Sequence, residues 1–354
     1  MTLSNEQKFL LLCADYPLSN DKLKQAQKLI EQGINIKEVI KLSKYQLCNN
    51  TIYLNLKKIG YKGREMNELE KLFYFSLLRN SVLKKELRRL TKKLKEKKIK
   101  VILLKGWALK EALGEDFAFQ SDIDLLAREK DFNLIGLELK EMGYEKKETF
   151  FYKLFKNYSI HVPFIKKSDS FIIDFELHRH LVFPINSFNL DMEKMWHDSK
   201  PIKENKYLRS FHPEDQLIHL ALHLIYSHSF LLALPNLLRI KKITEEWNIN
   251  WNKLTERAIE FKVCEIVYYS LFLAQELFEV EIPESTMNKL EKNSKKNSLQ
   301  FLKNFGGKEI LKSEFGLKDK VLFRLRYMYF RFYWTKNLMD KIRLIPFIKG
   351  FLFD

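Results

Sequence analysis

Val101 to Ala127 read VILLKGWALKEALGEDFAFQSDIDLLA, and the expected fold is built around these residues. They predict a buried strand, a tight turn at Gly106, a short helix, a loop and a second strand that carries Asp122 and Asp124. Residues two apart on a strand point to the same face, so the two carboxylates lie side by side. Like charges this close stay ionised together only where cations neutralise them. Two aspartates at the end of an apolar strand therefore predict a site for a divalent metal ion and phosphate.

The composition is that of a folded chain with large apolar cores. Of the 354 residues, 46% are hydrophobic and 14% aromatic, and only 11 are glycine and 8 proline. A chain of this length is expected to form more than one domain. The cysteines are odd in number and set in apolar surroundings, which predicts reduced core residues and a cytoplasmic protein: Cys13, Cys48 and Cys264.

Neither a leader peptide nor a membrane span is expected. The residues after Met1 lack the basic and then apolar pattern of a signal peptide. No uncharged apolar run approaches the roughly 18–20 residues that span a membrane. The net charge of +17 favours an anionic partner. The same charge would arise if the whole composition were simply rich in lysine, without any anionic partner. We favour this interpretation over nucleic-acid binding.

Residues 1–98 are expected to be helical. The pattern from Glu68 to Lys98 predicts one long helix. Four leucines form its apolar stripe: Leu83, Leu87, Leu90 and Leu94. The opposite face is rich in lysine and arginine, which suits either a surface that follows a phosphate backbone or the solvated face of a packed helix. We favour the packed helix.

A second acidic pattern follows in the segment FIIDFELHRHL, Phe171 to Leu181. It predicts a strand with one polar and one apolar face. Asp174, Glu176 and His178 share the polar face. Two acids on one strand face either complete a metal site or form ion pairs with basic neighbours, and a single acid would favour the ion pair.

These segments together resemble the nucleotidyltransferase superfamily whose catalytic domain is similar to that of DNA polymerase beta. Its signature is an apolar strand, a glycine turn that opens a helix, and Asp-x-Asp on the next strand. Here the turn is KG at positions 105–106 and the acidic pair is DID at positions 122–124. The sequence LLKGWAL followed by SDIDLL resembles one branch of this superfamily more closely, the bacterial and mostly uncharacterised nucleotidyltransferase family 5. The resemblance covers roughly residues 70–285.

The resemblance implies a nucleotidyltransferase, which moves a nucleoside monophosphate from an NTP such as ATP to an acceptor hydroxyl and releases pyrophosphate. It implies two Mg²⁺ ions, with Mn²⁺ as a substitute, held by Asp122, Asp124 and a third carboxylate. In relatives, the segment that corresponds to residues 171–181 carries an acid, an apolar residue and a histidine in succession. Glu176 matches this pattern, and Asp174 on the same face is the alternative.

The resemblance also implies an α+β fold in three parts. Residues 1–98 form an N-terminal helical region, and residues 99–200 form the catalytic domain around a small mixed sheet. Residues 201–354 form a C-terminal helical domain with a basic aromatic tail. The active site is expected between the sheet and the C-terminal helices.

Four residues are predicted to contact the nucleotide. Gly106 permits close backbone approach, and the helix from Trp107 offers free N–H groups to a phosphate. Lys105 adds a point charge, and Ser121 directly precedes the acidic pair. Three features depart from the family, and one of them lies in a later helix, where Ile240, Lys241 and Lys242 occupy the place of an aspartate that relatives often carry. Trp107 replaces the usual serine, and residues 117–120 lack the arginine that relatives often carry there.

A histidine-rich helix is expected at residues 213–228. His219 and His223 stand four residues apart, on one helix face. Together with His178 they form a possible substrate pocket. The spacing also permits zinc binding, but it is a weak signal without the metalloprotease glutamate, and plain packing is favoured.

The acceptor is not identified by the sequence. The basic charge favours an RNA or tRNA end or a protein over a cationic small molecule. For the tail, residues 319–354, a helix docked on the body is favoured over nucleic-acid binding and over contact with an anionic membrane surface. Because the usual arginine and serine are missing, the alternative from another class is a catalytically degenerate module that binds a nucleotide or a partner.

Overall fold

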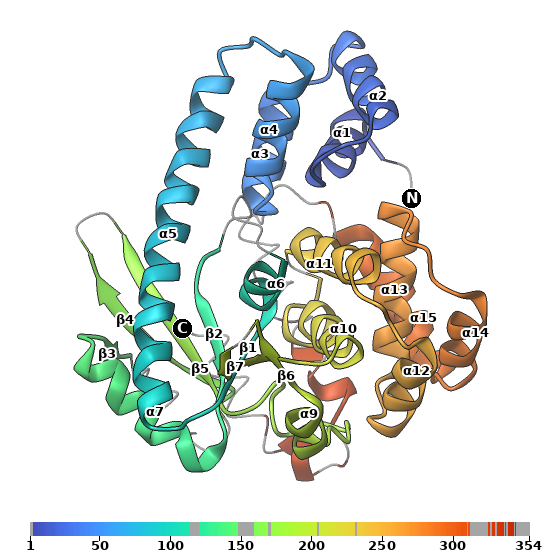
Figure 1. Cartoon of the computed structure of the whole chain (residues 1–354). Coiled ribbons are helices and arrows are strands. Elements are labelled where there is room, and N and C mark those ends of the chain that lie inside the picture. Colours follow the sequence, from blue (N-terminus) through green and yellow to red (C-terminus); the bar gives the residue numbers. More distant parts are fainter. Residues whose placement is uncertain are drawn as a thin grey trace.

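One mixed β-sheet with helices on both faces forms the centre of the fold (Figure 1). The structure is a computed structural model. It describes residues 3–113, 120–147, 159–168, 171–203, 205–230 and 232–309, residue 311, and scattered positions between 325 and 344. Helices flank the sheet, and most of them precede or follow it in the chain, which confirms the predicted α+β class.

The N-terminal helices lead into a long helix that packs on the sheet. They are α1 (Asn5–Ala14), α2 (Asn20–Glu31), α3 (Ile36–Tyr45), α4 (Asn49–Ile59) and α5 (Met66–Glu96). All four leucines of the predicted stripe are buried in α5, which confirms the packed helix. Lys93 on its basic face pairs with Glu138 (2.7 Å) and Glu141 (2.8 Å) of α7 (Glu129–Glu141). Part of the basic face is therefore neutralised within the protein.

The sheet has seven strands within the described residues. They are β1 (Val101–Leu103), β2 (Ile123–Leu126), β3 (Glu145–Lys146), β4 (His161–Lys167), β5 (Ile172–His178), β6 (Lys200–Ile202) and β7 (Asn205–Ser210), in the order β3-β4-β5-β2-β1-β7-β6. β2 runs antiparallel to β1 and parallel to β5. With α6 (Lys105–Leu113) between β1 and β2, the predicted strand–helix–strand unit is confirmed.

β6 and β7 were not expected, because the sequence from about residue 200 reads as helical. β7 nevertheless pairs in parallel with β1 in the centre of the fold. Its sequence NKYLRS buries one large apolar side chain, Leu208, so no alternating hydrophobic pattern announces it. The sheet extends to Ser210, and the division into three domains at residues 98 and 200 stays a prediction.

Each face of the sheet has its own hydrophobic core, because side chains alternate along a strand. Leu103 and Leu125 pack with the leucines of α5, whereas Ile102 and Leu126 belong to the core of the C-terminal helices. These helices are α9 (Met192–Asp198), α10 (Pro213–Leu222), the π-helix η2 (His223–Ser227), α11 (Ala233–Glu246), α12 (Trp251–Glu260), α13 (Cys264–Phe278), α14 (Glu284–Lys292) and α15 (Lys296–Glu309).

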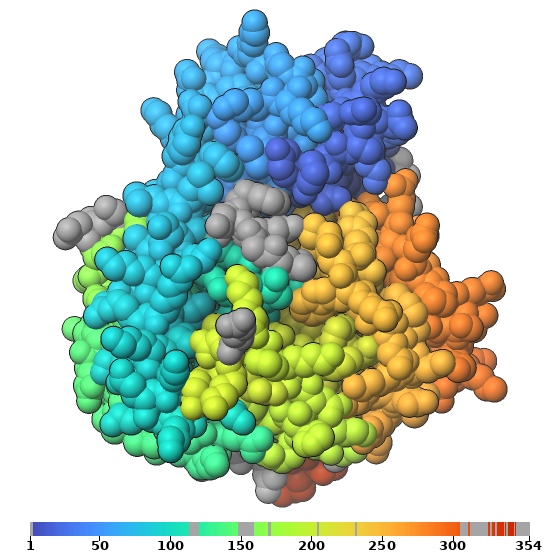
Figure 2. Space-filling model, viewed as in Figure 1, coloured from blue at the N-terminus to red at the C-terminus, as the bar shows by residue number. Residues whose placement is uncertain are grey.

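The first and last helices of the chain also pack on one another. α1 contacts α13, and Figure 2 shows the blue N-terminal helices seated against the orange C-terminal ones. Among the described positions of the tail, Trp334 is buried and the Arg331 guanidinium lies 4.3 Å from the centroid of the Tyr226 ring. These positions are docked on the body, whereas most of the tail lies outside the described residues. Within the described chain, every helix is too short or too polar to cross a membrane.

Candidate active site

Three carboxylates converge where β2 lies beside β5. The parallel register sets Asp124 next to Glu176, and Asp122 lies just before β2. One oxygen atom from each of these three residues lies within 4.8 Å of the other two. Asp124 is only 2% exposed. The structure therefore brings together the three acids that the sequence and the family resemblance singled out.

Lys105 is an internal counter-ion of this cluster. Its ammonium Nζ lies 2.6 Å from Asp124 Oδ1 and 3.8 Å from Glu176 Oε2. The predicted point charge is present, but it contacts the carboxylates directly. Its backbone φ of +52° also shows that the left-handed residue of the turn is Lys105 and not Gly106, where the tight turn was predicted.

Gly106 is required for a different reason, the packing around the first turn of α6. A Cβ atom there would lie 2.4 Å from Gln120 Oε1 and 2.8 Å from Arg239 Nη2. The close approach predicted for Gly106 is thus made by two side chains of this protein.

His178 donates a hydrogen bond to the Asp124 carboxylate and lies close to that of Glu176. Its Nε2 lies 2.9 Å from Asp124 Oδ1 and 3.4 Å from Glu176 Oε2. Burial alone would lower the pKa of His178, but the contacts with these two acids raise it above its usual value. The possible pocket residue predicted from the sequence is therefore a direct neighbour of the acids.

The negative charges of the cluster are unevenly neutralised. Burial, and then the charge of Asp124, raise the pKa of Asp122 to about 7. Burial acts in the same direction on Asp124, but Lys105 and His178 hold the pKa of Asp124 well below its usual range. Among lysines and arginines of the described chain, Lys105 is the one ion-paired with these acids. Three carboxylates exceed one ammonium and, when His178 is protonated, one imidazolium, which leaves an excess of negative charge.

This donor set fits a hard divalent cation. Mg²⁺ prefers carboxylate, phosphate and water oxygens. Oxygens of Asp122, Asp124 and Glu176 lie close enough to share one ion. Burial and the charge of Asp124 raise the pKa of Asp122, and the charge of Lys105 offsets this rise only in part. These three residues are the ones that would hold Mg²⁺ or Mn²⁺, and binding would separate Lys105 from Asp124.

The alternative third acid, Asp174, lies outside this group of three. Burial, and then the charge of Glu176, raise the pKa of Asp174 to about 6. Within the described structure, its buried Oδ1 has no hydrogen-bond partner. The geometry therefore favours Glu176 as the third carboxylate.

Trp107 and Ser121 support the acidic loop from both sides. Trp107 is 1% exposed, and its indole Nε1 donates a hydrogen bond to the main-chain oxygen of Asp122 (2.7 Å). Ser121 Oγ donates to Asp122 Oδ1 (3.0 Å). The side chain that stands where relatives have a serine is thus part of the core, and contact of Trp107 with a phosphate stays a prediction.

Sequence reasoning missed a basic cavity next to α6. A cavity of about 130 Å³ is lined by residues of α4, α6 and α11, and its charged lining residues are Asp15, Lys110, Arg239 and Lys242. Arg239 reaches from α11 to the first turn of α6, and its Nη1 lies 3.4 Å from Asn236 Oδ1. Burial lowers the pKa of Arg239, while the charges of Asp124 and Asp122 oppose that shift. No local motif marks this arginine, because it is distant from the acids in the sequence.

The histidines after the sheet form a group in which His219 is buried and His223 and His228 are half-buried. His223 Nδ1 lies 3.2 Å from Asn236 Oδ1, and His228 Nε2 lies 2.9 Å from His223 Nε2. Burial, and then the charge of Lys105, lower the pKa of His219 to about 3. Among the described residues, no set of three metal-ligating side chains surrounds His219 and His223, so the zinc interpretation gains no support. Their role in a substrate pocket stays a prediction.

A comparison with known families identifies the group to which this site belongs. A family model described as an uncharacterised nucleotidyltransferase matches residues 32–279, more than two thirds of the chain. The chain belongs to this nucleotidyltransferase family. The match contains the acidic cluster, α6 and the histidine-rich helix, and it confirms the resemblance found in the sequence. No curated protein and no solved structure matches the chain. Membership in this nucleotidyltransferase family supports general nucleotidyl transfer and implies an NTP donor.

Proposed function

We propose that the protein transfers a nucleoside monophosphate from an NTP to an acceptor hydroxyl, with release of pyrophosphate. One observation carries the proposal, namely the convergence of Asp122, Asp124 and Glu176 oxygens within 4.8 Å of one another. When bound, Mg²⁺ would neutralise charge on the triphosphate and activate the attacking oxygen. Asp122 and Asp124 would hold the metal ions, and Mn²⁺ would substitute for Mg²⁺.

Glu176 would act on the acceptor side of the reaction. Its side chain is 20% exposed, against 3% for Asp124, so an incoming hydroxyl reaches it more easily. In this position Glu176 can orient the hydroxyl and accept its proton at a carboxylate oxygen. His178, which contacts both acids, fixes their positions.

Cationic side chains around α6 would bind the triphosphate. Arg239 lies at the first turn of α6, whose N-terminal N–H groups favour anions. A guanidinium there can supply the charge that relatives obtain from an arginine before the acidic pair. Once a metal ion neutralises Asp124, the ammonium of Lys105 becomes available to a phosphate oxygen.

The acceptor we favour is an RNA end or a protein hydroxyl. The net charge of +17 would attract a polyanion and repel a cationic small molecule. A cytoplasmic location, where NTPs and reduced thiols coexist, suits the three free, buried cysteines.

The proposal is tested by label transfer. Wild-type protein is incubated with each α-³²P-labelled NTP, Mg²⁺ and an acceptor pool of total RNA or protein, and compared with Asp122→Ala/Asp124→Ala. We expect an acceptor to become labelled only by wild type and only with Mg²⁺. The matched control Asp21→Ala/Glu31→Ala removes two exposed acids of α2 and should transfer label like wild type. Equal labelling by wild type and the Asp122/Asp124 variant would exclude the proposed chemistry.

A second candidate function is nucleotide binding without turnover. The ion pair between Lys105 and Asp124 favours it, because a cation of the protein already contacts a predicted metal ligand. The same samples separate the two functions. A degenerate module would bind an NTP through the acids, yet label no acceptor.

A further inference from the structure

The register of the sheet places a second histidine next to the acids, one that the sequence did not single out. β4 and β5 are antiparallel, and His161 stands directly opposite His178. Directly opposed residues have Cβ atoms roughly 4.5–5.5 Å apart. Glu176 lies two residues before His178 and so shares its face. Two imidazoles and a carboxylate are therefore held on neighbouring strands of a rigid sheet.

The distances among these side chains match the spacing of metal ligands. Glu176 Oε1 lies 3.5 Å from His161 Nε2, and Glu176 Oε2 lies 3.4 Å from His178 Nε2. Ligand atoms of a tetrahedral site with bonds of about 2.1 Å are roughly 3.4 Å apart. All three ligand atoms lie within 4.8 Å of one another.

We infer that His161, Glu176 and His178 form a metal site for a divalent transition-metal ion of the zinc type, distinct from the all-oxygen site for Mg²⁺. Two nitrogen ligands favour Zn²⁺ or Co²⁺ and disfavour Mg²⁺, which prefers oxygen. The inference goes beyond the proposed function, because this ligand set selects a metal whether or not nucleotidyl transfer occurs. In an active enzyme, Glu176 would be shared between the two sites.

Charge and competing ligands are compatible with this site. The three carboxylates and Lys105 leave two negative charges, which one divalent ion neutralises. Ligation through Nε2 of His178 replaces its hydrogen bond to Asp124, which keeps its contact with Lys105. The three cysteines, the strongest rival ligands for zinc, are buried elsewhere in the fold.

Titration of the untagged full-length protein with Co²⁺, followed by visible absorption, tests the site. Wild type should saturate with one strongly absorbing Co²⁺ per chain, and Zn²⁺ but not excess Mg²⁺ should bleach the band. His161→Ala should weaken Co²⁺ binding at least tenfold, and the polar replacement His161→Asn should do the same. His197→Ala, which removes a histidine that is 88% exposed, should bind Co²⁺ like wild type.

Unchanged Co²⁺ affinity and spectrum in both His161 variants, with circular dichroism like that of wild type, would overturn the inference. The outcome is independent of the transfer assay. Asp122→Ala should abolish label transfer and keep the Co²⁺ band. If wild type transfers no label but His161→Ala still loses the band, the proposed function fails and the metal site stands.

Discussion

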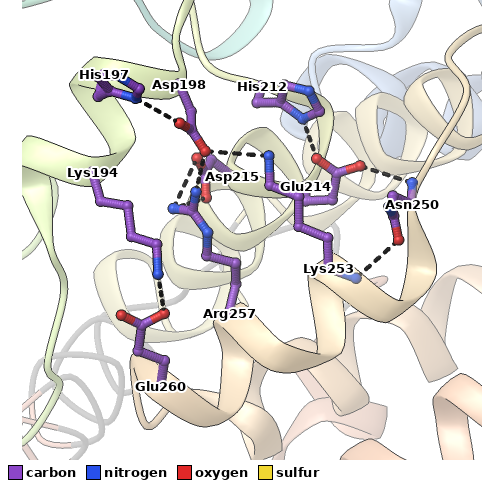
Figure 3. Close-up of polar contacts among 10 residues, drawn as sticks. All are labelled: Lys194, His197, Asp198, His212, Glu214, Asp215, Asn250, Lys253, Arg257 and Glu260. Carbon is purple, nitrogen blue, oxygen red and sulfur yellow. Dashed lines mark hydrogen bonds and ion pairs between the residues drawn. The ribbon is translucent and has the colours of Figure 1, made fainter.

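Two groups of carboxylates in the described structure are neutralised to different degrees. In the first group, Arg257 on α12 lies between two acids (Figure 3). Its Nη1 is 3.1 Å from Asp215 Oδ1, its Nη2 contacts Asp198, and Lys253 Nζ is 3.2 Å from Asp198. Nearby, the fully buried Glu214 accepts a hydrogen bond from the Asn250 main chain (2.7 Å). Each acid of this group, which we call the α10–α12 network, has at least one cationic or hydrogen-bonding partner.

The acidic cluster of the sheet differs in the charge of the groups that most strongly influence its acids. Burial raises the pKa of Asp215 to about 6, and the next largest influence, Arg257, opposes that rise. Burial raises the pKa of Asp122 to about 7, and the next largest influence, Asp124, adds to it. A buried acid that a protein balances internally holds the fold together. Acids left with too few cations are available to an external one, and this difference supports our proposal that the sheet cluster is the functional site.

The largest expected effect separates the two acids of β5. Glu176→Gln should reduce label transfer by roughly 10³-fold, because it removes a metal ligand that also serves as the proposed base for the acceptor hydroxyl. Asp174→Asn should stay within roughly threefold of wild type, because Asp174 lies outside the group of three. Initial rates at saturating NTP measure both. The reverse order of the two effects would show that Asp174 is the third carboxylate.

Removal of the Arg257 guanidinium should strongly destabilise the protein through the α10–α12 network. Arg257→Ala leaves Asp215 buried without its partner, which typically costs about 3–5 kcal/mol. Urea unfolding followed by circular dichroism measures this loss, and added Mg²⁺ should not restore it.

Lys105→Met is the change in the sheet cluster that corresponds to Arg257→Ala, because it also removes the cation paired with a buried acid. The variant should lose stability in EDTA, but Mg²⁺ should restore it, because the metal ion replaces the missing ammonium. Similar responses of the two variants to Mg²⁺ would remove the distinction drawn between the two groups of acids.

Arg239 should matter for the nucleotide and not for the fold. Arg239→Met is expected to raise KM for the NTP about tenfold to a hundredfold, and Arg239→Lys should restore part of the loss, since it keeps the charge but not the fork of donors. Steady-state kinetics against NTP concentration measures the effect. An unchanged KM in Arg239→Met would place the triphosphate away from α11.

The smallest expected effect is on the pH dependence of stability. The folded pKa of Asp122, about 7, lies above its usual value of 3.8, so its contribution to stability is fully present below pH 3.8 and is lost as the pH rises through 7. In EDTA, Asp122→Asn should therefore gain about 1–2 kcal/mol over wild type between pH 5 and pH 7, within the limit of about 1.4 kcal/mol per pH unit. Urea unfolding at both pH values checks this. A constant difference between the two proteins would mean that Asp122 is already balanced.

The parts of the site that the sequence predicts are those set by local periodicity. Alternation along a strand places Asp122 with Asp124, and Glu176 with His178, on one face, and the leucines of α5 follow the helical period. These inferences need only the geometry of a single element. The family resemblance then supplies the reason to look for a third carboxylate.

The rest depends on pairing between distant segments. Only the parallel register of β2 and β5 sets Asp124 beside Glu176, and only the register of β4 and β5 brings His161 opposite His178. Arg239 reaches α6 through helix packing. The direction of the Lys105 side chain follows from a positive φ that no residue pattern announces at a lysine. The strands β6 and β7 were missed because they bury too little apolar surface to show an alternating pattern.

The central claim is that the under-neutralised acids of the sheet capture Mg²⁺ together with the phosphates of an NTP. Calorimetric titration with α,β-methylene analogues of the four NTPs tests it most directly. At least one analogue should bind wild type in Mg²⁺ and not in EDTA, and none should bind Asp122→Asn/Asp124→Asn. Binding that persists in EDTA, or that is unchanged in this variant, would contradict the account.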